Sequence, residues 1–414
     1  MSKKRKLIPE IRFPEFKNEG EWDLKTLEDV LDYERPDKYI VHNTNYLNEG
    51  TPVLTANKSF ILGYTNEDFG IYKKLPAIIF DDFTVDSKFV NFSFKVKSSA
   101  IKILTPKKKY DLRFTYELIS QIDFNATEHK RYYISEYQKL KLPFPLPKEQ
   151  LKIASCLSSL DDLIEAHNQK LDLLKDHKKG LIQNFFPQEG GKMPKYRFSE
   201  FINDENWIKE TVGDVYDFKV TNSFAREYLN YENGSVKNIH YGDIHTKFNT
   251  LFDISKEDVP FINPDVSIEK IRKESYCIAG DIIFADASED MNDVGKSIEI
   301  VNLNKENLVS GLHTLLARQK EKKLAIGFGG YLFKSDWIRK QIQREAQGAK
   351  VLGISATRIS NVQILYPKNH KEQQKISSCL SSLDELIKSQ AEKIEKLKKH
   401  KKGLMQVLFP KMIE

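Results

Sequence analysis

The sequence predicts an α+β protein with two globular arms joined by two long antiparallel coiled-coil helices, and with internal pseudo-two-fold symmetry. Two repeats predict this arrangement. Residues 149–187 and 372–410 are copies of one segment, with roughly 24 of about 39 aligned positions identical and no gap. A shorter aromatic segment occurs at 9–16 and again at 194–201. Because the long copies lie far apart in the chain, each one follows an arm of its own.

The long repeats predict the two helices. Apolar residues alternate spacings of four and three from Ile153 to Leu181, and again from Ile376 to Leu404. This pattern holds for about four heptads and predicts a coiled-coil seam. Prolines that stop or start a helix flank both copies. Two nearly identical seams favour antiparallel pairing, which gives both arms equivalent surroundings, although the heptads alone also allow a parallel pair.

The arms have a different pattern, with short β-like runs separated by glycine, proline and asparagine. The runs are 77–80, 89–96 and 100–104 in the first arm, and 281–284, 297–301 and 362–365 in the second. One helix is expected late in each arm, at 114–122 and 330–347. The predicted divisions are an N-terminal segment 1–23, first arm 24–146, central helical repeat 147–187, linker with aromatic segment 188–208, second arm 209–366 and C-terminal helical repeat 367–414.

Composition excludes several classes of protein. Three cysteines without close spacing argue against a disulfide scaffold or a zinc site. No apolar stretch approaches the ~18 residues of a membrane span, and no apolar segment follows the basic start. We therefore expect no membrane association and a cytoplasmic protein in a reducing compartment. The net charge of +6 permits a nucleic-acid partner without requiring one.

Motifs of catalysis are incomplete. Residues 295–297 read Gly-Lys-Ser, but a phosphate loop needs its first glycine where Asp290 stands. His240 and His245 lack a third metal ligand at suitable spacing. Asp286 follows an apolar strand, as nuclease carboxylates do, yet no Glu-x-Lys partner follows it. The sequence therefore predicts no catalytic, cofactor-binding or metal-binding residue.

Four motifs carry a family resemblance. They are Glu-Gln-x-Lys-Ile at 372–376, Leu-x-x-Leu-Asp-x-Leu-Ile at 157–164, Lys-Lys-Gly-Leu-x-Gln-x-x-Phe-Pro at 178–187, and Arg-Phe-x-Glu-Phe with a later tryptophan at 197–207. Over essentially its whole length, the chain resembles the specificity subunit of a type I restriction-modification system. In the second arm, 241–244, 280–285 and 347–355 resemble that family's target-recognition domains. The first arm departs from them at 55–57, 77–82 and 126–135.

The resemblance implies a non-catalytic subunit that recognises DNA and serves as a scaffold. Two target-recognition domains would read a bipartite double-stranded site, with a helix length that sets the spacing of the half-sites. Two methyltransferase subunits would dock on the helices, and restriction subunits would join through them. The outcome would be N6-adenine methylation or ATP-dependent cleavage. S-adenosylmethionine, ATP and Mg²⁺ would belong to those partners, with no cofactor on this chain.

Loops rich in basic and small polar residues are the predicted DNA contacts, because such groups reach phosphates and base edges. In both arms, the alternative interpretation of each residue is that it lies in a solvated turn and contacts no DNA. The candidates are Asn57, Lys58, Thr84, Lys130, Arg131, Tyr132 and Tyr133 in the first arm, and Asn222, Ser223, Arg226, His245, Ser288, Lys296, Gln347, Lys350 and Arg358 in the second. Tyr132 and Tyr133 are expected to offer a stacking surface beside Lys130 and Arg131.

The repeated helices supply the predicted partner contacts. Two copies of one partner need two copies of one surface, and the near-identical helices provide them. The candidates are Ser158, Ser159 and Asp161, with their equivalents Ser381, Ser382 and Asp384. A solvated helix face is the alternative interpretation of these residues.

Two other classes of function remain open from the sequence. One is a standalone DNA-modifying enzyme with unfamiliar motifs, and the other is a coiled-coil adaptor that binds only proteins. Turnover of DNA by the lone chain would favour the enzyme, and a lack of DNA affinity in any complex would favour the adaptor.

Overall fold

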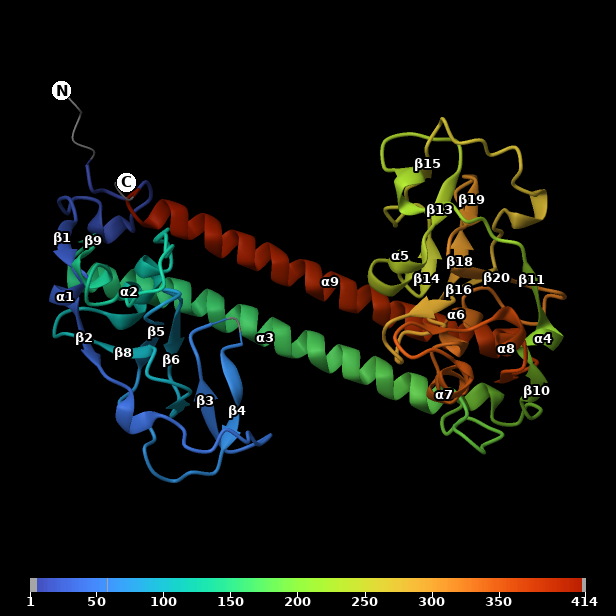
Figure 1. Cartoon of the computed structure of the whole chain (residues 1–414), viewed down its shortest axis with the longest axis horizontal. Helices are drawn as coiled ribbons and strands as arrows, with labels where there is room; N and C mark the ends of the chain where they lie inside the picture. Colours follow the sequence, from blue (N-terminus) through green and yellow to red (C-terminus); the bar gives the residue numbers. More distant parts are fainter. Residues whose placement is uncertain (1–5, 58, 412–414) are drawn as a thin grey trace. The chain divides into compact units, whose positions relative to one another are not determined.

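A computed structural model describes residues 6–57 and 59–411, which form two compact units (Figure 1). Unit 1 combines the chain up to Asn168 with the segment from Glu392 onward, and unit 2 is Gln169–Ala391. Each unit contains one arm and parts of both long helices. The predicted α+β class is confirmed, since each arm mixes sheets with short helices.

Unit 1 is built on a four-stranded antiparallel sheet in the order β2-β8-β5-β6. Its strand β5 is buried along its whole length because it is one apolar run, Ala-Ile-Ile-Phe, before Asp81. A three-stranded sheet β4-β3-β7 and a pair β1-β9 complete the arm. The bounds are β1 Asp23–Thr26, α1 Leu27–Val30, β2 Leu31–Glu34, β3 Thr51–Leu54, β4 Ile61–Thr65, β5 Ala77–Asp81, β6 Ser87–Val90, β7 Lys95–Val96, β8 Ile101–Pro106, α2 Leu112–Ile119 and β9 Lys141–Phe144.

Unit 2 has a five-stranded sheet β11-β20-β16-β18-β14 and a four-stranded sheet β12-β15-β13-β19, with pairs β10-β22 and β17-β21. Its buried strand β16 corresponds to β5 of unit 1. The bounds are β10 Ile208–Thr211, α4 Val212–Val215, β11 Tyr216–Lys219, β12 Leu229–Asn230, β13 Lys237–Ile239, α5 Tyr241–Thr246, β14 Leu251–Asp253, β15 Phe261–Ile262, β16 Ile282–Ala285, β17 Ala287–Ser288, β18 Ser297–Asn302, β19 Leu308–Ser310, β20 Thr314–Gln319, α6 Phe328–Leu332, α7 Asp336–Glu345, β21 Leu352–Gly353, α8 Ala356–Ser360 and β22 Gln363–Tyr366.

Two predicted elements are divided in the structure. The run 89–96 forms β6 and then β7, because Val90 pairs with β5 while Val96 pairs in parallel with β3 of the other sheet. The predicted helix 330–347 is α6 followed by α7, since α6 closes at Phe333 and Ser335 begins a new helix in extended conformation. Periodicity of apolar residues does not record such breaks.

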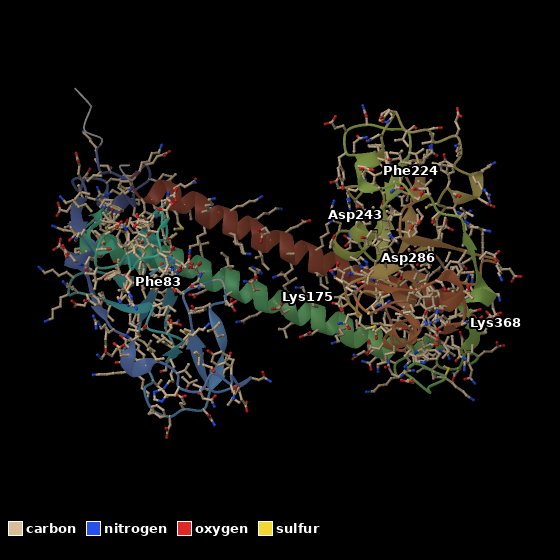
Figure 2. All side chains as sticks on the ribbon, in the orientation of Figure 1. Phe83, Lys175, Phe224, Asp243, Asp286 and Lys368 are labelled. Carbon is tan, nitrogen blue, oxygen red and sulfur yellow. The ribbon has the colours of Figure 1, made fainter. Side chains whose placement is uncertain are left out.

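The two repeats form the long helices α3, Pro147–Phe185, and α9, His370–Leu408. In unit 1, Ile153 near the start of α3 shares a core with Leu408 at the end of α9. In unit 2, Phe185 at the end of α3 shares a core with Ile376 near the start of α9. The helices therefore run antiparallel within each unit, as predicted. The exposed Lys175 projects from α3 (Figure 2).

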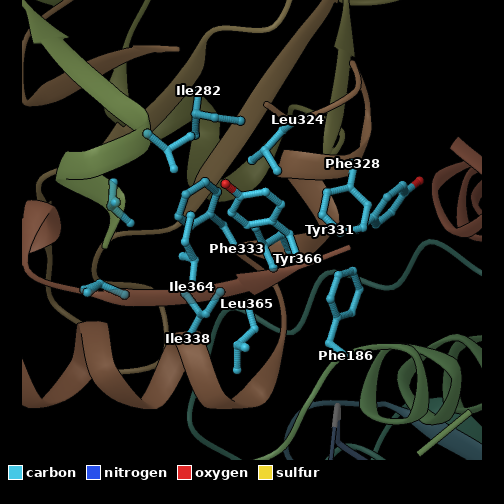
Figure 3. Packing of buried hydrophobic residues seen from close by; sticks show 14 of the residues in the cluster. Phe186, Ile282, Leu324, Phe328, Tyr331, Phe333, Ile338, Ile364, Leu365 and Tyr366 are labelled. Atoms are coloured by element: carbon cyan, nitrogen blue, oxygen red, sulfur yellow. The ribbon is translucent and has the colours of Figure 1, made fainter. Parts of the chain in front are cut away.

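Aromatic side chains fasten the helix ends into the arms. In unit 1, Trp22 and Phe114 both pack against Phe409 at the end of the second repeat. In unit 2, Phe186 packs against Phe328, and both are labelled in Figure 3. Phe186 also packs against Trp207. Large buried aromatic rings contribute strongly to core stability. The repeated Phe-Pro exits are thus part of the hydrophobic cores.

A buried ion pair fixes each aromatic segment on its helix. Arg12 donates two hydrogen bonds to Glu149, at 2.7 and 2.6 Å, and Arg197 donates two to Glu372, both at 2.7 Å. All four side chains are nearly inaccessible to solvent. The bonds to Glu149 raise the pKa of Arg12. The same pairing therefore occurs twice in the chain, each time between an arginine of the aromatic repeat and a glutamate of the helical repeat.

Among the described residues, no helix is both long enough and apolar enough to cross a membrane.

Candidate nucleic-acid interface

The two arms hold their candidate loops on one common framework. Asp82 follows β5, donates its N–H to the carbonyl of Ala100 at 2.8 Å, and accepts from the N–H of Tyr132 at 2.9 Å. Asp286 follows β16 and makes the same two bonds, to His313 at 3.0 Å and from Ile354 at 2.8 Å. The loop after the buried strand is therefore tied to the last loop of the arm in both units. The last loops of the two arms, 126–135 and 347–355, are thus held by equivalent backbone bonds, although their sequences are only loosely similar.

In unit 1, this framework presents a stack of aromatic and cationic groups. The rings of Phe83 and His129 lie 5.0 Å apart with planes inclined by 16°. The Arg131 guanidinium lies 5.5 Å from the centre of the Phe83 ring and 3.8 Å from the Asp82 carboxylate. Figure 2 shows Phe83 on this unit. A cation beside aromatic rings can contact both phosphates and bases.

The expected stacking role of Tyr132 and Tyr133 is wrong. Their side chains are only 2% and 1% exposed and belong to the core. Tyr133 packs against Phe80 and Tyr33, and its burial raises the pKa of its hydroxyl. The stack consists instead of the half-buried Phe83 and the exposed His129, which the sequence interpretation missed. The available signal was the position of Phe83 directly after the buried strand and its aspartates.

The other candidates of the first arm differ in accessibility. Asn57 and Thr84 are exposed, and the Thr84 N–H donates to Asp81 at 3.0 Å in the tight turn after β5. Lys130 forms ion pairs with Glu128 and Glu136, at 2.9 and 2.8 Å, so acids of its own loop already neutralise it. Lys58 lies outside the described residues.

In unit 2, α5, β17 and the loop 286–296 come together. His245 of α5 contacts the carbonyl of Ala287 through Nε2 at 3.0 Å, and Lys296 donates to the His245 carbonyl at 2.7 Å. Ser288 is nearly buried, and its hydroxyl accepts from the Asp290 N–H at 3.0 Å. The structure thus brings His245, Ser288 and Lys296 to one place. Ser288 supports the loop there, so its hydroxyl is not an open contact group.

Two further candidates brace loops. Asn222 donates to Asn238 and to the carbonyl of Ser310, at 3.0 and 2.9 Å, and holds the segment that carries the exposed Ser223. Arg358 donates to the carbonyl of Glu345 at 2.7 Å and closes the end of α7. The Asn222 amide is therefore engaged inside the arm, whereas Arg358 uses Nη1 there and its side chain stays 35% exposed.

The last loop of unit 2 presents an exposed lysine. Backbone bonds of 2.9 and 2.7 Å join Gln347 and Gly353 and leave Lys350 at the exposed tip. Gly348 has φ +132°, and a Cβ there would lie 2.0 Å from the carbonyl oxygen of Val351. Only glycine fits this position. The loop that carries Lys350 is therefore shaped by its backbone.

Asp243 and Asp286 of unit 2 are labelled in Figure 2. His313 has a left-handed backbone, φ +53°, and its ring contacts Asp286 at 3.1 Å and lies edge-on to Tyr241. Residues other than glycine rarely adopt this conformation. His313, Asp243 and Lys247 were missed by the sequence interpretation. Over the described part of the chain, no cluster of three or more histidine, cysteine or acidic side chains is arranged to hold a metal.

Comparison with known proteins now identifies the architecture. The family described as a type I restriction modification DNA specificity domain matches residues 19–176 and 204–399. The chain belongs to this family. Specificity subunits recognise DNA sequence and are not catalytic, so the expected non-enzymatic class is confirmed.

Individual specificity subunits are similar over different lengths. That of the Escherichia coli type I restriction enzyme EcoR124I/EcoR124II is 42% identical over 154 residues, which is 36% of this chain and 38% of that relative. The MjaVIII specificity subunit of Methanocaldococcus jannaschii is 24% identical over 400 residues, covering 92% of this chain and 87% of the relative. The crystal structure of the M. genitalium S subunit shares the fold, with TM-score 0.60, 14% identity and coverage of 98% and 100%.

The helix residues predicted to meet partners of this specificity subunit divide into two groups. Asp161 accepts from Lys401 at 2.7 Å and binds Arg113, and Asp384 binds Lys178 and accepts from the Tyr331 hydroxyl at 2.7 Å. These carboxylates join helix to helix and arm to helix, yet their side chains stay 32% and 35% exposed, so their role as partner contacts remains a prediction.

The serines leave an accessible face. Ser159 and Ser382 are exposed, whereas Ser158 and Ser381 are half-buried. Next to them, Leu163 is 42% exposed and its repeat equivalent Leu386 is 57% exposed. An exposed leucine at the same place on both helices was missed, although its repetition in sequence could have indicated it.

Proposed function

We propose that this specificity subunit reads a bipartite double-stranded DNA site, with one half-site for each arm. The observation that carries the proposal is the common loop framework on Asp82 and Asp286, which bears different side chains in the two arms. A shared framework with different loops suits two DNA half-sites of unlike sequence. The helical repeats are too similar to supply that difference.

The proposed contacts follow from accessibility. In unit 1 they are the Phe83–His129–Arg131 stack together with the exposed Asn57 and Thr84. In unit 2 they are the exposed or half-exposed Ser223, Arg226, His245, Lys296, Gln347 and Lys350. We retain Lys58 as a proposed contact from its sequence alone. Tyr132, Tyr133 and Ser288 are left out because they are buried.

The two helices would hold two methyltransferase subunits, one on each copy of the repeat. Ser159 and Leu163 on α3, and Ser382 and Leu386 on α9, offer the same combination of an exposed hydroxyl and an exposed apolar group. Matched surfaces of this kind suit two copies of one partner. Those partners would bring S-adenosylmethionine and transfer a methyl group to adenine N6. Restriction subunits, with ATP and Mg²⁺, would join the same assembly in the cytoplasm.

Helix length would act as a ruler for the half-sites. The proposed domain divisions remain those of the sequence: arms at 24–146 and 209–366, and helical repeats at 147–187 and 367–414. Because each arm is fastened to its helix by a buried aromatic core, the spacing of the half-sites should be fixed. We propose a spacing near one turn of DNA, about 34–36 Å.

Mapping of methylated adenines tests the proposal. DNA from cells that carry a methyltransferase subunit is sequenced with and without this chain. The expected result is methylation at two short motifs with a fixed number of unread base pairs between them, seen only when the chain is present. A continuous unsplit motif would contradict the two-arm assignment. DNA turnover by the purified chain alone would favour an enzyme, and a complex without DNA affinity would favour a protein adaptor.

A further inference from the structure

A buried carboxylate in unit 2 holds two cations at the surface. Asp243 lies in α5 with its side chain 2% exposed, and its Oδ1 accepts from Arg226 Nη2 at 3.0 Å. The same oxygen lies 3.5 Å from Lys247 Nζ. The Arg226 and Lys247 side chains are each about half exposed. The arrangement therefore carries one buried negative charge and two accessible positive charges.

The donors of Arg226 are divided in a way that restricts what it can bind. Besides its bond to Asp243, Nη2 lies 3.3 Å from His240 Nδ1. That ring nitrogen also accepts from the Gly242 N–H at 3.2 Å, so it carries no proton. Burial, and then the charge of Arg226, lowers the pKa of His240, which keeps the ring neutral. Both hydrogens of Arg226 Nη2 are thus directed into the protein.

Bidentate recognition of guanine needs a fork, which is a pair of neighbouring N–H donors on the guanidinium. An arginine has two such forks, Nε with Nη2 and Nη1 with Nη2. With Nη2 occupied, the Nε–Nη2 and Nη1–Nη2 forks of Arg226 are both incomplete. Nη1 and Nε are bonded neither to Asp243 nor to His240, and the Tyr231 hydroxyl also interacts with the Arg226 side chain. Separate donors suit the dispersed oxygens of a phosphate better than the edge of a base.

Lys247 is also held in place by neighbouring side chains while one of its donors stays available. Its ammonium donates to the Tyr231 hydroxyl at 2.8 Å and lies 5.0 Å from the centre of the Tyr231 ring. The bond to Tyr231 and the nearby Asp243 raise the pKa of Lys247, so the group stays charged. An ammonium has three hydrogens, and Tyr231 and Asp243 account for two of them. One donor remains for a ligand.

We propose that Arg226 and Lys247 form a clamp for a phosphate group of the duplex backbone, and that Asp243 is its positioning residue. This inference rests on the proposed function, because it assigns one contact within the DNA-reading arm. The clamp would fix the register of unit 2 on the duplex without reading sequence. Base discrimination would come from other loops, such as those that carry Lys296 and Lys350.

The test uses the full chain in complex with its methyltransferase subunit. Affinity for a duplex with the mapped site is measured over a series of salt concentrations, with the wild type and with Arg226→Gln/Lys247→Gln. Each phosphate contact contributes about 0.9 to the slope of log affinity against log salt. The double variant should reduce the magnitude of that slope by about 1 and weaken binding roughly 10-fold at moderate salt. Its preference among altered base pairs should match that of the wild type.

A matched control separates this clamp from general charge. Arg344→Gln/Lys340→Gln removes two exposed cations from α7 of the same unit. It should leave the slope and affinity close to wild type. An equal loss in the control, or a changed base preference in the clamp variant, would overturn the proposal.

Asp243→Asn tests the positioning role. The substitution raises the net charge by one, so an effect of charge alone would strengthen DNA binding. If Asp243 positions the cations, binding should instead weaken, and stronger binding would contradict that role. Should this buried variant fail to fold, the surface double variant still decides on the clamp. Wild-type complex that binds no bipartite site would overturn the proposed function, whereas normal wild-type binding with unaffected variants would overturn the clamp alone.

Discussion

The buried pair of Arg197 and Glu372 should be worth far more to unit 2 than its exposed ion pairs. Replacing Arg197 with methionine leaves the Glu372 carboxylate buried, with Trp207 Nε1 at 3.3 Å as its remaining side-chain donor. Removal of one member of a buried pair costs about 3–5 kcal/mol, because an uncompensated charge stays behind. For a unit of this size, that loss lowers the melting temperature by about 6–20 °C.

Calorimetry of the full chain measures the effect. Arg344→Met is the matched control, since Arg344 pairs with Glu189 at the exposed surface, where such pairs contribute little to stability. The double variant Arg197→Met/Glu372→Met should recover most of the lost stability, because it removes both charges together. A single variant that is no less stable than the control would refute the reasoning. So would a double variant that loses the sum of both single effects.

Three more outcomes follow from burial and exposure. Tyr133→Ala should lower the free energy of unfolding by about 3–5 kcal/mol in denaturant titration, whereas Phe83→Ala should leave stability nearly intact and weaken binding to one half-site by about 1–3 kcal/mol. Burial raises the pKa of Glu299 to about 7 from an ordinary 4.5, so folded unit 2 holds more protons than the unfolded chain between these values. Its stability should therefore fall as the pH rises from 4.5 to 7, and Glu299→Gln should remove this dependence in melting experiments. Leu163→Lys or Leu386→Lys should weaken one methyltransferase contact each in titration calorimetry, and the double variant should abolish assembly with unchanged melting.

Much of the fold was accessible from the sequence because it depends on local periodicity and repetition. The heptads from Ile153 to Leu181 predict a helix whatever surrounds it. Lys178 and Lys401 occupy seam positions in that pattern, which apolar residues usually fill. The structure explains them, because each lysine meets an aspartate of the other helix. Such a partner lies more than 200 residues away, and the pattern of one helix does not specify it.

The candidate site was less predictable, since its shape depends on bonds between distant loops. Residue type alone made Tyr132 and Tyr133 look like a stacking surface, but the bond from Tyr132 to Asp82 turns this segment into the core. Arg226 was predicted as a contact. The contacts of its Nη2 with His240 and Asp243 depend on the folded α5 and could not be predicted from the sequence. Long-range backbone bonds therefore decided which polar groups face outward.

The ion pairs between the long helices follow the internal repeat of the chain. Asp161 of the first repeat meets Lys401 of the second, and Asp384 of the second meets Lys178 of the first. Asp161 is equivalent to Asp384, and Lys178 to Lys401. This reciprocity is the pattern of an isologous dimer, in which one residue of a subunit contacts another across a two-fold axis, and the reverse contact is made as well. The two units therefore share one scheme of contacts between the repeats, although the loops of their arms differ.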